Sequence, residues 1–154
     1  MASYLRGIAD ALADGLGDVS WSITGTTVER RNWASIDVDA MSVPHVFVVP
    51  GNATMSRVSR DAMQTEYTVT VFVGRHVQTD SDVDGMLDLA DEVLLRVRAH
   101  DFQTVSFPSG VTSPQTVTID VNPDDALTER NVWRAVIVAT YIVFESNYLP
   151  TPTP

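Results

Sequence analysis

Acidic side chains gather at one turn of the chain, and their spacing is the first feature that could do chemistry. Asp80, Asp82 and Asp84 alternate just before a glycine, and Asp88 and Asp91 follow. Alternating aspartates before a glycine match most of a calcium-binding EF-hand loop, in which carboxylate oxygens converge on one cation. These five aspartates are therefore the candidate metal ligands.

The same turn also fits the capped start of a helix, and its surroundings favour that interpretation. The twelfth loop position is Asp91, where a bidentate glutamate is usual, and a strand-like segment precedes the loop in place of an entering helix. Ser81 as N-cap with Asp84 three residues later approximates a capping box. We predict a helix from Ser81 to Arg98 and keep a calcium-binding interaction module as an alternative. The apolar stripe of the predicted helix begins inside the supposed calcium loop and consists of Val83, Leu87, Ala90, Leu94 and Val97.

Other catalytic patterns are missing from the sequence. His45, His76 and His100 show no metal-ligand spacing, and neither a G-x-S-x-G nor a G-x-G-x-x-G motif occurs. The chain has no cysteine, and all of its basic residues are arginines, so cysteine nucleophiles and lysine bases are excluded. We expect a protein that is not an enzyme and needs no cofactor.

Composition is typical of a folded globular protein, with 44% hydrophobic and 19% charged residues among 154. The net charge of −10 disfavours tight binding of nucleic acid, because an acidic surface repels phosphates. Apolar runs are too short to span a bilayer, and the N-terminus lacks the pattern of a secretory signal. We expect no membrane partner and synthesis in the cytoplasm.

Hydrophobic periodicity predicts an α+β fold: a mostly antiparallel β-sheet with two amphipathic helices packed on one face. Residues 1–145 are expected to form a single domain, and residues 146–154 a proline-rich extended tail. The predicted elements are a helix at 3–16, strands at 19–23 and 45–49, a weaker extended segment at 34–39, an exposed loop at 51–60, a strand at 65–74, the helix described above, a loop at 100–115, and strands at 116–121 and 132–144.

The last strand is apolar on both faces, which predicts burial on both faces. Two helices cover only one side of a sheet, so either a loop-built layer or a neighbouring subunit must cover the other. We favour the subunit, because the long loops and the tail are suited to reach a neighbour. The candidate interface residues are Arg57, Arg60, Phe72, Trp133, Tyr141, Phe144 and Tyr148.

Four segments in this order carry a resemblance to a known family. A proline-bounded PHVFVVP strand is followed by EYTVTVFV, then by the acidic DVDGMLDLADEV helix, and finally by NVWRAVIVATY. Over residues 1–145 this pattern resembles the tail terminator and tail-completion proteins of long-tailed bacteriophages.

The resemblance implies a structural virion protein at the head–tail junction. Such a subunit would form a homo-oligomeric ring, usually a hexamer, that caps the tail tube and joins it to the head. Its partners would be the tail tube protein and head-completion proteins of the neck, with DNA only passing through an acidic lumen. Contacts between subunits would involve strand edges, the loop at 51–60 and the C-terminal tail. A head-completion, stopper or connector protein of the neck is the alternative.

Overall fold

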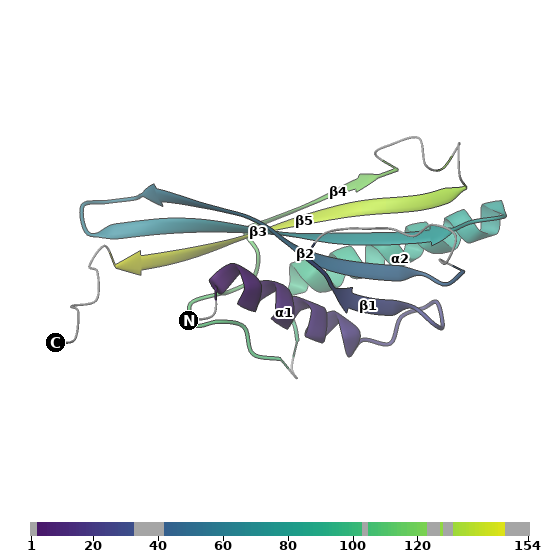
Figure 1. The fold of residues 1–154 in the computed structure, drawn as a ribbon, viewed down its shortest axis with the longest axis horizontal. Helices are drawn as coiled ribbons and strands as arrows, with labels where there is room; N and C mark the ends of the chain where they lie inside the picture. The colour runs from purple at the N-terminus through teal and green to yellow at the C-terminus, as the bar shows by residue number, and fades with distance from the viewer. Residues whose placement is uncertain (1–2, 33–41, 103–104, 123–126, 128–130, 147–154) are drawn as a thin grey trace.

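The computed structural model describes residues 3–32, 42–102, 105–122, 127 and 131–146. A five-stranded mixed sheet forms one layer and two helices form the other (Figure 1). In chain order the elements are α1 (Tyr4–Gly17), β1 (Thr27–Arg30), β2 (His45–Arg57), β3 (Ala62–His76), α2 (Asp80–Ala99), β4 (Thr116–Val121) and β5 (Val132–Ser146). The predicted α+β class is confirmed.

The strand order is β1-β2-β3-β5-β4, and only the β1–β2 pair is parallel. The central antiparallel pair, β3 with β5, is continuous from Ala62 opposite Ser146 to His76 opposite Val132. Both helices lie against the same face of this sheet (Figure 1). The sheet is therefore mostly antiparallel, as predicted.

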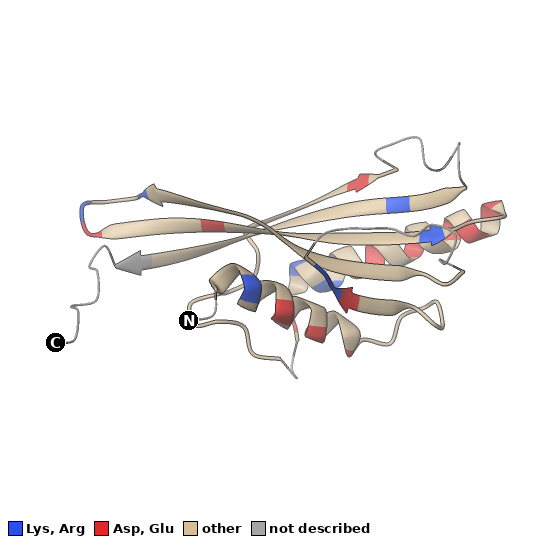
Figure 2. Ribbon diagram, viewed as in Figure 1, with Lys and Arg blue, Asp and Glu red and all other residues tan. Residues whose placement is uncertain are grey.

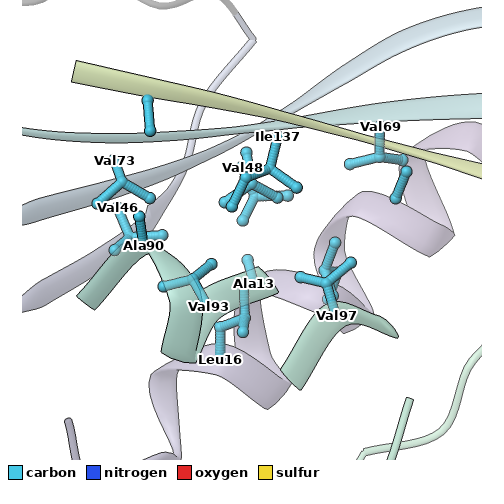
Figure 3. Close-up of a cluster of buried hydrophobic side chains, with 14 of the residues drawn as sticks. Ala13, Leu16, Val46, Val48, Val69, Val73, Ala90, Val93, Val97 and Ile137 are labelled. Carbon is cyan, nitrogen blue, oxygen red and sulfur yellow. The ribbon is translucent and has the colours of Figure 1, made fainter. Parts of the chain in front are cut away.

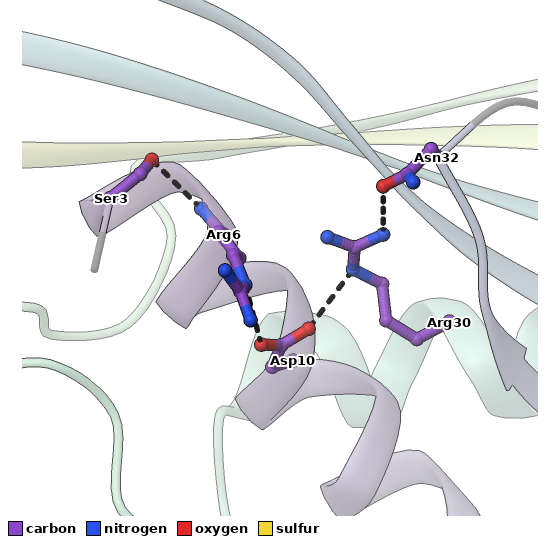
Figure 4. A network of polar contacts seen from close by, with 5 residues as sticks. All are labelled: Ser3, Arg6, Asp10, Arg30 and Asn32. Carbon is purple, nitrogen blue, oxygen red and sulfur yellow. Dashed lines mark hydrogen bonds and ion pairs between the residues drawn. The ribbon is translucent and has the colours of Figure 1, made fainter.

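Helix α1 begins and packs as its sequence predicts. The Ser3 hydroxyl accepts the N–H of Arg6 at 3.3 Å and caps the first turn. On the exposed side, Asp10 lies 3.7 Å from the guanidinium of Arg6 and 3.0 Å from that of Arg30 (Figure 4). The second ion pair joins α1 to β1 at the sheet edge.

The core lies between the two helices and the sheet face that they cover. Val48, Val71 and Ile137 stand side by side in one row across β2, β3 and β5, and all three are fully buried. Val93 and Val97 of α2 point at this row from the helix layer (Figure 3). Burial of such side chains contributes about 1.5–3 kcal/mol each.

The segment predicted as an exposed loop at 51–60 is instead the end of a long hairpin. Strand β2 continues across a bulge between Pro50 and Ala53 and pairs with β3 as far as Arg57 opposite Met63. The bulge accommodates Pro50 and Gly51 and lets the strand resume, so these residues do not end it. We call residues 51–68 the hairpin arm; it extends beyond the helix layer (Figure 1).

Two further strand predictions need comment. Residues 19–23 form bends and irregular backbone rather than a strand, and the N–H and hydroxyl of Ser22 donate to the Glu92 carboxylate of α2, at 3.3 and 3.1 Å. The strand of this region is β1 instead. The predicted strand at 116–121 has the observed bounds. The extended segment at 34–39 and residues 147–154 of the predicted tail lie outside the described residues.

Candidate interaction surfaces

The acidic turn is the capped start of α2. The backbone N–H of Asp82 donates to the Thr79 hydroxyl at 3.2 Å, and the Asp82 carboxylate accepts the N–H groups of Gln78 at 3.0 Å and Thr79 at 3.3 Å. These bonds form a capping box. The pKa of Asp82 is lowered, first by the Gln78 N–H and also by the guanidinium of Arg75. The helix prediction is right, but the cap lies two residues before the predicted Ser81.

The remaining candidate metal ligands do not converge. Asp80, Asp84, Asp88 and Asp91 are exposed along α2, while Asp82 is engaged in the cap. Among the described residues, no three histidine, aspartate or glutamate side chains are grouped so that they could hold a metal ion. The geometry therefore gives the calcium hypothesis no support.

The buried stripe of α2 is rotated relative to the predicted one. Leu87 is 41% exposed and Leu95 is 51% exposed, although Leu87 was predicted to face the core. Both leucines lie among aspartates on the side of the helix that points away from the sheet. The buried residues are Met86, Leu89, Ala90, Val93 and Val97. We define the α2 outer stripe as Asp84, Leu87, Asp88, Asp91 and Leu95.

The three histidines lie in different elements and have different surroundings. The Nδ1 atom of His45 lies 2.8 Å from the Thr27 hydroxyl, which joins β1 to β2. His100 ends α2 in the left-handed conformation, and its ring centroid lies 4.2 Å from that of Phe107 and 5.9 Å from that of Tyr141. Burial lowers the pKa of His100 and raises the pKa of Tyr141. This cluster anchors the loop after α2.

A polar pocket of about 440 Å³ lies between the end of β3 and the start of α2. It is lined by Ser42, Arg75, His76, Gln78 and Asp82. The Arg75 Nη1 and Asp82 Oδ1 atoms are 3.8 Å apart within it. Asp82 is already the capping residue of α2, so the pocket has a structural explanation.

The predicted interface residues fall into four groups, of which three follow here. Arg57 and Arg60 are exposed on the hairpin arm, and Phe144 is 66% exposed at the same end of the sheet. Phe72 is half-buried on the sheet face without helices. Tyr148 lies outside the described residues.

Trp133 and Tyr141 require a correction as interface residues. Both have no exposed surface, because alternation along β5 points them into the core beneath the helices. They stabilise the subunit itself. In this conformation they offer no surface to a neighbour.

The sheet face without helices is only partly covered within the subunit. Phe47 is 4% exposed, with the guanidinium of Arg31 4.3 Å from the centre of its ring. Its neighbours in the same row, Phe72 and Val136, are half-buried. The prediction that β5 is buried on both faces therefore holds on one face only, because no helix covers the other.

The sequence interpretation missed two apolar residues of the hairpin arm. Met55 is 63% exposed and Val58 is 53% exposed. Their segment was interpreted as an exposed loop because it is polar and includes Arg57 and Arg60. The threonine and valine in it, with their β propensity, are the signal that could have indicated a strand.

Comparisons with known proteins give a distant structural similarity. No protein-family profile and no curated protein sequence matches the chain. Among solved structures, a chain of the "Virion of native gene transfer agent (GTA) particle" aligns over 87% of this chain and 84% of its own, with 10% identity and a TM-score of 0.42. At that score and identity, the similarity carries no functional argument. Within the described residues, no helix is both long and apolar enough to cross a membrane.

Proposed function

We propose that this chain is a structural virion protein at the head–tail junction of a long-tailed phage. In this role it is a tail terminator whose copies form a ring, a hexamer by resemblance, that caps the tail tube and joins it to the head. The observation that carries the proposal is the hairpin arm, which projects beyond the helix layer and exposes apolar side chains. Such surfaces mark contacts with other proteins.

Unpaired strand edges at the arm support assembly. Strand β1 pairs with β2 only from His45 to Val48, and β4 pairs with β5 only from Ala135 to Thr140. Within the described residues, the outer edges of the arm on both sides therefore have no strand partner. Exposed edges of this length invite pairing with another chain, and in a monomer they promote aggregation.

The negative net charge of the chain supports a ring through which DNA passes. The net charge of −10 leaves an acidic surface that repels phosphates, so DNA in a lumen would slide without sticking. The partners of the ring are the tail tube protein and the head-completion proteins of the neck. The chain is made in the host cytoplasm and ends in the virion neck. A stopper or connector protein of the same neck is the alternative role.

Light scattering of the purified chain and electron microscopy of particles test this proposal. We expect rings in solution or on tail tubes, and antibody label at the neck of virions. A chain that stays monomeric and does not bind tail tubes would contradict it. Tails purified without heads separate the two roles, because a terminator remains on their upper end whereas a stopper remains with filled heads.

A further inference from the structure

The β2 half of the hairpin arm exposes the same sheet face that the helices cover in the body of the molecule, whereas Thr65 and Tyr67 in the β3 half are buried. Ala53 stands opposite Tyr67, Met55 opposite Thr65 and Arg57 opposite Met63, in the rows that continue the core-facing side. Ala53, Met55 and Arg57 are all exposed, because the helix layer ends before it reaches them (Figure 1). Within the described residues, Arg57 has no ion pair.

The helix layer offers a surface of matching chemistry on its outer side. The α2 outer stripe places Leu87 and Leu95 among Asp84, Asp88 and Asp91, all of them exposed. Asp84, Asp88 and Asp91 give the outer side of α2 a negative charge, and Arg57 lies at the end of β2 near the tip of the arm, where Figure 2 shows acidic residues as well. The charge complementarity between the two surfaces is therefore that of Arg57 with the aspartates of the α2 outer stripe.

The spacing of the two surfaces also matches. Met55 and Arg57 are two residues apart on one strand face, a separation of about 7 Å. Asp91 and Leu95 are one helical turn apart, a separation of about 6 Å. An apolar contact between Met55 and Leu95 therefore brings Arg57 within reach of the Asp91 carboxylate.

We propose that the hairpin arm of one copy packs across α2 of the next copy, with Met55 against Leu95 and Arg57 paired with Asp91. This inference rests on the proposed function, because it requires copies of the chain to associate. A second copy is the occupant because one chain carries both halves of the contact. The arm and α2 are different surfaces, so the contact suits a head-to-tail repeat, which is the arrangement that a ring requires.

A charge-swap series tests the pairing. Arg57→Glu and Asp91→Arg each place like charges at every contact, and we expect either variant to weaken association by about tenfold or more. The double variant Arg57→Glu with Asp91→Arg restores opposite charges at every contact, so association should recover. Sedimentation velocity across a concentration series measures the association of each variant.

Asp120→Arg is the matched control. Asp120 is exposed on β4, away from both surfaces, and its reversal changes the net charge by the same amount as Asp91→Arg. We expect wild-type association from this variant. Circular dichroism melting of every variant reports whether the fold is retained.

The outcomes separate this inference from the proposed function. A wild-type chain that forms no oligomer and binds no tail tube overturns the proposed function. An oligomer that tolerates both single reversals, or a double variant that does not recover, overturns the arm-to-α2 contact and leaves the ring in place.

Discussion

Asp82 is an ionisable residue whose carboxylate stabilises the fold. Its carboxylate accepts two backbone N–H groups, from Gln78 and Thr79, at the start of α2. Such bonds satisfy donors that have no partner within the helix. A residue that first suggests a cation site is therefore part of a cap.

Replacement of Thr79 by alanine tests the cap directly. The substitution removes the hydroxyl that accepts the Asp82 N–H, and we expect a loss of about 1 kcal/mol in the free energy of unfolding. Thr79→Ser keeps the hydroxyl and should retain most of that stability. Urea unfolding with and without calcium measures both variants. Stabilisation by calcium that disappears in Asp82→Asn would instead restore the metal hypothesis.

His100 predicts a pH dependence of stability. Burial lowers its folded pKa below the ordinary value of 6.5, so the unfolded chain binds the proton more readily. The contribution of His100 is complete above pH 6.5 and is lost as the pH falls from there toward the folded pKa. His100→Asn removes the titration while an asparagine tolerates the positive φ of 53°.

Urea unfolding at about pH 5.5 and about pH 7.5 compares this variant with the wild type. We expect a smaller difference in the free energy of unfolding between the two pH values for His100→Asn. An equal difference in the two proteins would show that His100 does not contribute.

At the scale of elements, the bulge at Pro50 and Gly51 decides the length of the arm. A Cβ atom on Gly51 would lie 2.7 Å from the carbonyl oxygen of Thr68, whose hydroxyl accepts the N–H of Asn52 at 2.8 Å. Backbone this close leaves no room for a side chain. Glycine is therefore required where the strand resumes.

Gly51→Ala should destabilise the protein by about 1–3 kcal/mol, because the backbone of the arm must shift to relieve the contact. Gly17→Ala is the control: its added methyl meets nothing within 4 Å, and alanine favours a helix over glycine by about 1 kcal/mol. Thermal melting of Gly51→Ala and Gly17→Ala measures the effect of each substitution on the melting temperature. Equal melting temperatures for both variants would contradict the close approach at Gly51.

The sequence predicts most elements but not the arm, and the reasons are physical. Residues 116–121 alternate between turn signals, so their strand has the predicted bounds. Pro50 and Gly51 usually end strands, and only the distant Thr68 shows that a bulge accommodates them. The stripe of α2 was misplaced because Leu87 and Leu95 are apolar yet exposed, which blurs the helical period.

The sequence predicts the position of the N-cap of α2 less accurately than it predicts the helix itself. Thr79 and Ser81 are both suitable N-cap residues, and the general preference for serine points to Ser81, which is not the cap. The end of β3 determines which residue becomes the cap. The N–H of Val77 donates to the carbonyl of Asn131 at 2.8 Å, and this bond fixes where the chain leaves the sheet. That long-range bond is invisible in a local pattern.

At the scale of the whole molecule, two aromatic residues of β5 separate stability from assembly. Trp133→Ala should cost about 3–5 kcal/mol, because the side chain is fully buried. Phe144→Ser should leave the free energy of unfolding nearly unchanged and weaken association, because Phe144 is 66% exposed. Chemical unfolding and sedimentation measure the two quantities. A large loss of stability in Phe144→Ser would place that residue in the core.

The uninterrupted pairing of β3 with β5 has a mechanical consequence. Its fifteen-residue strands run from the body of the sheet to the end of the arm, a length of about 50 Å. The same paired strands form the arm and the part of the sheet against which the helices pack, and their pairing has no register shift between the two ends. A neighbour that tilts the arm would therefore also displace the strands against which α1 and α2 pack.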